Sequence, residues 1–190
     1  MPDLILLNGP PGIGKSTLAR MYADRHPGCL NLDIDQVRCL IGGWQEDFQE
    51  AGEIVRPIAV GMAAAHLSTG RDVVMPQFFD NDAEIAVFRG AAETSGAGFL
   101  EIVLTDTKAG SLQRFANRGA DEHTPWHAQI TVLVERQGGS ALLESMYENL
   151  ASGLRTRPDA VLIHSTYGAA EAAYTDLLRA LASMRPASQT

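Results

Sequence analysis

The sequence predicts an α/β protein whose strands form one parallel sheet. Short apolar runs rich in Leu, Ile and Val alternate with segments of helical periodicity along the chain. Such continuous apolar runs are typical of strands that are buried on both faces. Each intervening helix can supply the right-handed crossover that two parallel strands require. With 190 residues, of which 45 % are hydrophobic, the chain is expected to fold as a single domain, residues 1–190.

Five strands are predicted, and the spacing between them leaves room for helices. They cover residues 4–8, 29–33, 72–75, 99–105 and 160–164. The first helix is expected at residues 15–25 and the last at 169–183. Between the second and third strands, apolar residues recur at helical spacing, and they include Phe48, Val55, Ala59, Met62 and His66. Pro57 interrupts this face, so we expect a kink or the junction of two helices there, with Gly70 as the terminator. His66 is interpreted as a core histidine.

Charge and cysteine content exclude several classes of protein. Fifteen basic and 23 acidic residues give a net charge of −8, so binding to long nucleic acid is not expected. The two cysteines, Cys29 and Cys39, have no zinc-site spacing and are expected as free thiols in a reducing compartment. No signal peptide or membrane-spanning segment is evident in the sequence. We therefore expect a cytoplasmic protein without a membrane partner; the sequence leaves the oligomeric state open.

A phosphate-binding motif follows the first predicted strand. Residues 9–16 read Gly-Pro-Pro-Gly-Ile-Gly-Lys-Ser and match G-x-x-x-x-G-K-[ST]. Its glycines let backbone N–H groups point at phosphate oxygens, and the following helix directs its positive end at the same anion. Lys15 is expected to bind the terminal phosphates and Ser16 to bind Mg²⁺. The predicted ATP-binding residues are Gly9, Pro10, Pro11, Gly12, Ile13, Gly14, Lys15, Ser16 and Thr17.

Two carboxylates follow the second predicted strand, in the sequence Asn-Leu-Asp-Ile-Asp-Gln-Val-Arg at residues 31–38. Ligands of open α/β sheets bind beyond the carboxyl ends of the strands, so Asp33 and Asp35 should face the nucleotide. A carboxylate there can accept the proton of an attacking hydroxyl, which makes Asp35 the candidate base. The alternative is that Asp35 only caps a helix beginning at Gln36. Asp33 is a weaker candidate for the base and a candidate ligand of acceptor or Mg²⁺.

These motifs resemble one group of P-loop kinases. The group includes phage-type polynucleotide 5′-hydroxyl kinases, chloramphenicol phosphotransferase, gluconate kinase and zeta-toxin kinases. The likeness spans most of the chain but is dense only at residues 4–16, 31–38 and 114–119. It implies a P-loop NTPase fold with five parallel strands in the order 2-3-1-4-5, flanking helices and a helical lid. It also implies that Asp35 is the base and Arg38 its partner on the acceptor side.

The chain between the last two predicted strands is too long for one crossover helix. A lid insertion is therefore expected at about residues 107–137. Arg114 and Arg118 lie four residues apart within it, on one helical face. A closed lid would bring both guanidinium groups against phosphate oxygens, where they would act in catalysis. The alternative is a solvated helix face.

Four further residues are candidates for the binding site. Gln77 follows the third strand, where these kinases usually carry an acidic residue, so Mg²⁺ would depend on Ser16 and Asp33. Gln77 itself is a candidate acceptor-binding residue. Trp44 could stack on the acceptor or pack against the adjacent helix. Ser165 and Thr166, after the fifth strand, are candidates for the adenine pocket.

Together these features predict an ATP- and Mg²⁺-dependent kinase that phosphorylates a hydroxyl of a small molecule. A nucleoside, a sugar or an antibiotic-like compound is the favoured acceptor. The first alternative is a polynucleotide 5′-hydroxyl kinase. The second is a nucleotide-hydrolysing switch or ATP-binding module, for which GTP is disfavoured because no N-K-x-D stretch is present.

Overall fold

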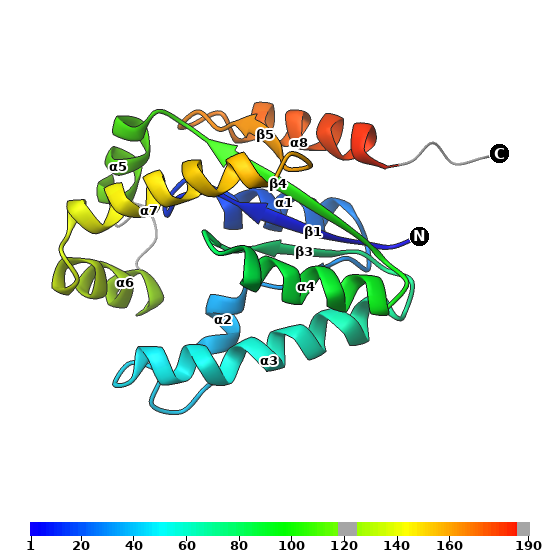
Figure 1. The fold of residues 1–190 in the computed structure, drawn as a ribbon, viewed down its shortest axis with the longest axis horizontal. Coiled ribbons are helices and arrows are strands. Elements are labelled where there is room, and N and C mark those ends of the chain that lie inside the picture. The colour runs from blue at the N-terminus through cyan, green and yellow to red at the C-terminus, as the bar shows by residue number, and fades with distance from the viewer. Residues whose placement is uncertain (118–124, 186–190) are drawn as a thin grey trace.

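The computed structural model describes residues 1–117 and 125–185, and in these segments a five-stranded parallel sheet forms the centre. Its order is β2-β3-β1-β4-β5, which confirms the predicted P-loop topology (Figure 1). The strands are β1 (Asp3–Asn8), β2 (Leu30–Asn31), β3 (Val73–Pro76), β4 (Gly98–Thr105) and β5 (Val161–His164). The helices are α1 (Lys15–Arg25), α2 (Ile34–Arg38), α3 (Phe48–Leu67), α4 (Asp82–Thr94), α5 (Lys108–Asn117), α6 (Pro125–Arg136), α7 (Ser140–Gly153) and α8 (Ala170–Met184), and a 3-10 turn covers Leu154–Thr156.

Helices cover both faces of the sheet, and β1 contributes to both cores. Ile5 and Leu7 pack with α1 and α8, whereas Leu4 and Leu6 pack with α3 and α4. Side chains alternate across a strand, so a central strand must be apolar at every position to fill both layers. All six residues of β1 are accordingly buried. Only Asp3 and Asn8, at the two ends of the strand, are polar.

The helix before β3 is continuous through Pro57. α3 runs over 20 residues, so the expected junction of two helices does not occur. Pro57 is exposed, on the side away from the buried stripe that contains Val55 and Ala59, so its ring does not disturb the packed face. The turn after the helix passes through Gly70, whose φ is +81°. His66 is half-buried, and its Nε2 lies 2.9 Å from the carbonyl oxygen of Gly28, as befits a core histidine.

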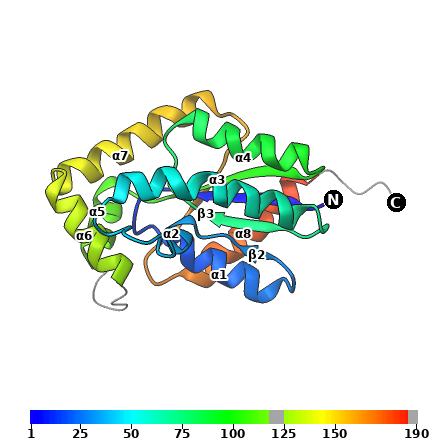
Figure 2. The same cartoon turned by 90° about the horizontal axis from the view of Figure 1, so that it is seen from below.

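Helices α5, α6 and α7 lie together beyond the carboxyl ends of the strands. Figures 1 and 2 show α5 and α6 at one end of the molecule, opposite the N-terminus and the end of α8, and α7 running from that end back toward the sheet. Lys108 joins α5 to α7 through ion pairs of 2.9 Å to Glu144 and 2.8 Å to Glu148. In the described part of the chain, no helix is long and apolar enough to cross a membrane.

A buried polar network connects this helical end to the sheet. Nη1 of Arg157, shortly after α7, donates to Oε1 of Glu101 in β4 at 2.6 Å, and both residues are buried. Asn8 Nδ2 donates to the same Glu101 oxygen at 3.0 Å and to the carbonyl oxygen of Phe79 at 2.8 Å. The N–H of Phe79 donates back to Asn8 Oδ1 at 3.0 Å. The network therefore fixes the ends of β1 and β3 relative to each other, and both ends border the candidate site.

Candidate active site

The loop between β1 and α1 has the backbone geometry of a phosphate-binding loop. Gly9, Gly12 and Gly14 have φ values of +143°, +81° and +104°, which L side chains rarely adopt. A Cβ on Gly9 would also lie 2.7 Å from the carbonyl oxygen of Leu104. The loop thus depends on its glycines for conformation and for its close approach to β4. The first turn of α1 follows at Lys15, and the N–H groups of a first helical turn point toward the N-terminal end of the helix, here the loop.

Lys15 and Ser16 are the polar side chains at the start of α1. Lys15 Nζ donates to the carbonyl oxygens of Gly9 at 2.7 Å and Pro10 at 2.9 Å, so it lies over the loop. Ser16 Oγ donates to Asp33 Oδ2 at 3.3 Å. The predicted loop residues and one predicted carboxylate therefore meet at the carboxyl edge of the sheet.

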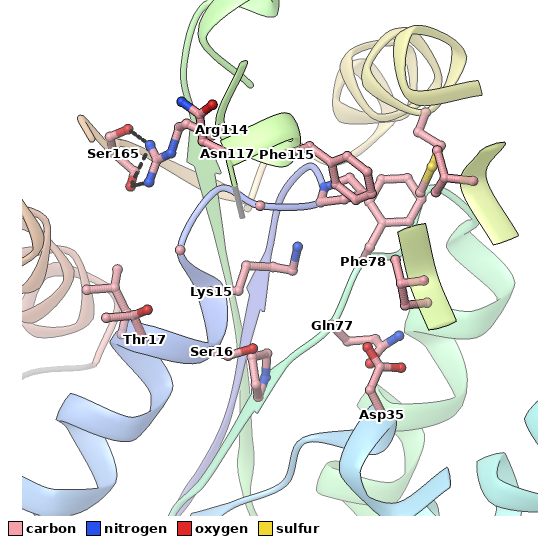
Figure 3. Close-up of a pocket in the computed structure, with 18 of the residues that line it drawn as sticks. Lys15, Ser16, Thr17, Asp35, Gln77, Phe78, Arg114, Phe115, Asn117 and Ser165 are labelled. Atoms are coloured by element: carbon pink, nitrogen blue, oxygen red, sulfur yellow. Dashed lines mark hydrogen bonds between the residues drawn. The ribbon is translucent and has the colours of Figure 1, made fainter. Parts of the chain in front are cut away.

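Asp33 and Asp35 have different surroundings. Asp33, not Asp35, is the N-cap of α2, because its Oδ1 accepts from the N–H of Asp35 at 3.1 Å and the helix begins at Ile34. Burial raises the pKa of the Asp33 carboxyl, and the hydrogen bonds from Asp35 N–H and Ser16 oppose that shift. Asp35 does not cap the helix. It lines the pocket, where its carboxyl group lies near the side chain of Gln77 (Figure 3).

Arg38 is the buried cation of the α2 segment. Its side chain lines the same pocket, and its guanidinium lies 4.1 Å from the centre of the Phe48 ring. Gly52 of α3 makes room for it, since a Cβ there would be 3.3 Å from Nη2. Burial lowers the pKa of Arg38, while the charge of Asp35 opposes the shift. An arginine stays charged under these conditions, so Arg38 gives this side of the pocket a fixed positive charge.

One cavity of about 640 Å³ contains both the loop and the second-strand residues. Lys15, Ser16 and Thr17 lie along one part of its wall, and Gln77 and Phe78 lie along another (Figure 3). The buried Oε1 atom of Gln77 accepts no hydrogen bond from the residues that the structure describes. The cavity therefore offers a phosphate-binding region and, beside it, a second compartment with an amide oxygen that is open to a donor.

Arg114 joins three segments of the chain. Its Nη2 donates to the carbonyl oxygen of Ile13 at 2.7 Å, and its Nη1 donates to the carbonyl oxygen of Ser165 and lies 3.4 Å from Asp106 Oδ2. Ser165 Oγ donates to Ile13 at 2.9 Å. The guanidinium thus contacts the backbone of the loop, where we had expected phosphate oxygens. Ser165 and Thr166 line the pocket on this side, and Arg118 lies outside the described residues.

Trp44 packs behind the pocket wall and is not itself among the residues that line the pocket. It is 9 % exposed and packs in a small apolar cluster with Ala51, against Phe48 and Ile130. This position matches the packing alternative, and stacking of Trp44 on an acceptor stays a prediction. An apolar part of the wall was not predicted; it is formed by Phe48, Phe78, Phe115, Ile130, Leu133, Val134, Leu142 and Met146. In the sequence these residues are indistinguishable from core positions.

Comparisons with known proteins agree with the fold and the loop. The profile of the AAA domain family matches residues 4–137. The chain belongs to this AAA domain family. No curated protein matches it.

Among solved structures, three similar proteins are a gluconokinase from Sinorhizobium meliloti 1021, the Deinococcus radiodurans tunicamycin resistance protein and the shikimate kinase of Bacteroides thetaiotaomicron. Their identities to this AAA domain are 16 %, 15 % and 16 %, with TM-scores of 0.59, 0.60 and 0.59. The alignments cover 97 %, 95 % and 95 % of this chain and 98 %, 96 % and 98 % of theirs. At such identities the likeness establishes the shared P-loop NTPase fold, which implies nucleotide binding.

Two potential metal ligands lie at the start of α1 and at the N-cap of α2. Within residues 1–117 and 125–185 there is no cluster of three or more His, Cys, Asp or Glu side chains that could hold a metal ion. Ser16 Oγ, at the start of α1, and Asp33 Oδ2 are nevertheless adjacent oxygen atoms of the kind that bind Mg²⁺. Mg²⁺ commonly takes one or two protein oxygens and completes its shell with water and phosphate. The pair therefore fits a nucleotide-bound Mg²⁺ better than a metal held by protein alone.

Proposed function

We propose that this AAA domain is an ATP-dependent kinase that transfers the γ-phosphoryl group to a hydroxyl of a small molecule. One observation carries the proposal: Asp35 and the phosphate-binding loop line the same cavity. A carboxylate beside the terminal phosphate is the arrangement that phosphoryl transfer to an alcohol requires. A protein that only binds or hydrolyses nucleotide needs no second compartment with its own carboxylate, amide and guanidinium.

The loop would bind the triphosphate. Lys15 now donates to two loop carbonyl oxygens, and it would exchange them for β- and γ-phosphate oxygens. Backbone N–H groups of the first turn of α1 add positive potential at the same place. Arg114 and Ser165 both donate hydrogen bonds to the carbonyl oxygen of Ile13. Their proposed role is therefore to position the loop and to border the base of the nucleotide. Arg118 keeps its proposed role at the phosphate oxygens.

Ser16 and Asp33 would hold Mg²⁺ together with phosphate oxygens and water. When bound, the ion neutralises charge on the phosphates during transfer. Asp33 caps α2, and the hydrogen bond from the N–H of Asp35 orients its carboxyl group for metal binding. The burial that raises the pKa of Asp33 would be offset by a divalent cation.

Asp35 would act on the acceptor. Its carboxylate would accept the proton of the attacking hydroxyl, which leaves the oxygen free to attack the γ-phosphorus. Gln77 lies near it (Figure 3), and its buried Oε1 can accept a hydrogen bond from the acceptor. Arg38 would bind the acceptor or steady Asp35 through its fixed charge. The names of the similar gluconokinase and shikimate kinase support a small acceptor.

The test is incubation with γ-labelled ATP, Mg²⁺ and pooled hydroxyl compounds, followed by mass spectrometry for a product about 80 Da heavier, the mass of one phosphoryl group. A labelled small molecule supports the proposal. Label on the 5′ end of an oligonucleotide would favour the polynucleotide kinase instead. Release of phosphate alone, stimulated only by a protein partner, would favour the nucleotide switch.

A further inference from the structure

The acceptor compartment is walled mainly by apolar side chains. Beyond Asp35 and Gln77, the cavity is lined by Phe78 from the loop after β3 and by residues of α6 and α7. The apolar residues from these two helices are Ile130, Leu133, Val134, Leu142 and Met146. Phe48, beneath the Arg38 guanidinium, continues the apolar wall on the α3 side.

Helix α6 contributes Ile130, Leu133 and Val134 to the wall of this compartment. Ile130 packs against the cluster of Trp44 and Ala51, and Gln129 Nε2 donates to the carbonyl oxygen of Gln45 at 3.0 Å. These contacts bring α6 across to the segment between α2 and α3. Val134 is only 8 % exposed although it lines the cavity. Ile130, Leu133, Leu142 and Met146 are half-buried, so this apolar wall is partly covered by the rest of the protein.

We propose that the acceptor is an amphipathic alcohol, with its reacting hydroxyl between Asp35 and Gln77 and an aromatic or branched aliphatic body against α6 and α7. This inference rests on the proposed kinase function and narrows it to one class of substrate. An apolar body gains from leaving water at this wall in proportion to the area it buries. A compound with a hydroxyl on every carbon would leave hydroxyls unpaired here, because Gln137 is the one polar side chain among the described residues 130–146 that line the cavity. Each such hydroxyl weakens binding by roughly 5- to 150-fold.

A matched pair of ligands tests the inference. 3-Phenyl-1-propanol and xylitol have equal numbers of heavy atoms, and each carries a primary hydroxyl. Their affinities are measured by calorimetry on the full chain, saturated with Mg²⁺ and a non-hydrolysable ATP analogue. We expect the aromatic alcohol to bind at least about tenfold more tightly, the discrimination that apolar pockets commonly reach. Equal or tighter binding of xylitol, or no binding of either compound, overturns the inference.

Two valines of α6 provide the matched variants. Val134→Thr puts a hydroxyl of equal size into the apolar wall, whereas Val132→Thr makes the same change at a position that is 43 % exposed and outside the cavity lining. Val134→Thr should lower the affinity for 3-phenyl-1-propanol by about fivefold or more, and Val132→Thr should leave that affinity unchanged. Met146→Gln repeats the test from α7 in case Val134→Thr does not fold. Equal effects at positions 132 and 134 would contradict the inference.

Failure of this inference and failure of the kinase function can be told apart. Binding of the ATP analogue is recorded separately in each preparation, and the same two alcohols are then offered with γ-labelled ATP. Transfer to xylitol in preference to the aromatic alcohol would leave the kinase standing and refute the apolar acceptor. Selective binding of the aromatic alcohol, with no transfer to any hydroxyl compound, would refute the kinase and leave the apolar compartment established.

Discussion

Asp33 and Asp35 are two residues apart but perform separate tasks in the structure. Asp33 accepts the N–H of Asp35 and the hydroxyl of Ser16, whereas Asp35 lines the pocket. The Asp35→Asn variant keeps the size and polarity of the side chain and removes the basic oxygen. We expect phosphoryl transfer to fall by roughly 10²–10⁴-fold, the usual contribution of acid–base assistance. The melting temperature and ATP affinity should hardly change, because the cap and the phosphate-binding loop are intact.

The matched control for that variant is Asp24→Asn, which makes the same charge change on an exposed position of α1. It should leave the transfer rate unaltered. A full transfer rate in Asp35→Asn would refute the catalytic role and favour the nucleotide switch.

Asp33→Asn should transfer phosphate more slowly than wild type, and raising the Mg²⁺ concentration should restore part of the rate, because its proposed defect is in metal binding. Insensitivity of Asp33→Asn to Mg²⁺ would count against Asp33 as a metal ligand.

Lys15 contacts only polar backbone atoms in the hydrogen bonds described above. Lys15→Ala should therefore change the free energy of unfolding by about 0.5–1 kcal/mol at most. Wild-type protein should gain about 2.7 kcal/mol from MgATP at 100 times its Kd, and the variant should lose that gain together with its activity. Thermal denaturation with and without MgATP measures both effects. Undiminished stabilisation by MgATP in the variant would contradict the phosphate-loop assignment.

Cys29 lies half-buried beside the edge of the sheet, and burial raises the pKa of its thiol to about 11. A thiol with a raised pKa is neutral below that pH, and only the thiolate reacts with alkylating agents. In a Cys39→Ser background, iodoacetamide at pH 8 should label Cys29 roughly 100-fold more slowly than free cysteine, and the rate should rise as the pH approaches 11. Mass spectrometry over a time course measures the rate. Labelling at the speed of free cysteine would show that the thiol is not protected.

At the scale of elements, the return from α7 to the sheet depends on the buried pair of Arg157 and Glu101, which are 7 % and 3 % exposed in their side chains. Arg157→Ala leaves a buried carboxylate without its cation, so the free energy of unfolding should fall by about 3–5 kcal/mol. Restoring neutrality with Arg157→Met and Glu101→Gln together should recover much of that loss. Arg179→Ala, which breaks an exposed ion pair with Asp176, is the matched control and should melt almost as wild type does. Chemical denaturation compares wild type with these three variants. Equal stability of Arg157→Ala and wild type would show that the Arg157–Glu101 pair does not stabilise the fold.

At the scale of the whole molecule, the net charge of −8 opposes the approach of a polyanion. Binding of nucleic acid draws on many phosphate contacts from basic residues and the release of counterions. A single-stranded oligonucleotide with a free 5′-hydroxyl should neither shift in a gel at physiological salt nor take label from γ-labelled ATP. Efficient labelling of the oligonucleotide would favour the polynucleotide kinase over the small-molecule kinase.

The elements of the fold could largely be predicted from the sequence because they arise from local patterns. Apolar runs marked all five strands, and the helix at residues 15–25 was predicted with the bounds that α1 has. The phosphate-binding loop was equally readable, since its conformation depends on glycines a few residues apart. The short edge strand β2 (Leu30–Asn31) and the N-cap at Asp33 differ from the prediction, because neighbouring segments decide where pairing and capping stop. The strand order came from the resemblance to P-loop kinases and not from the pattern of apolar residues.

The sequence by itself thus determined the sheet, the loop and the candidate carboxylates, whereas the tertiary structure decided what surrounds them. Arg114 contacts Ile13 and Ser165, which are 101 and 51 residues away along the chain. Trp44 is buried because Ile130 of α6 packs against its cluster. The apolar wall joins Phe78, in the loop after β3, to residues of the four helices α3, α5, α6 and α7. Local periodicity records which side of an element is buried, but the partner that buries it is set by packing between distant segments. That packing forms the proposed acceptor compartment.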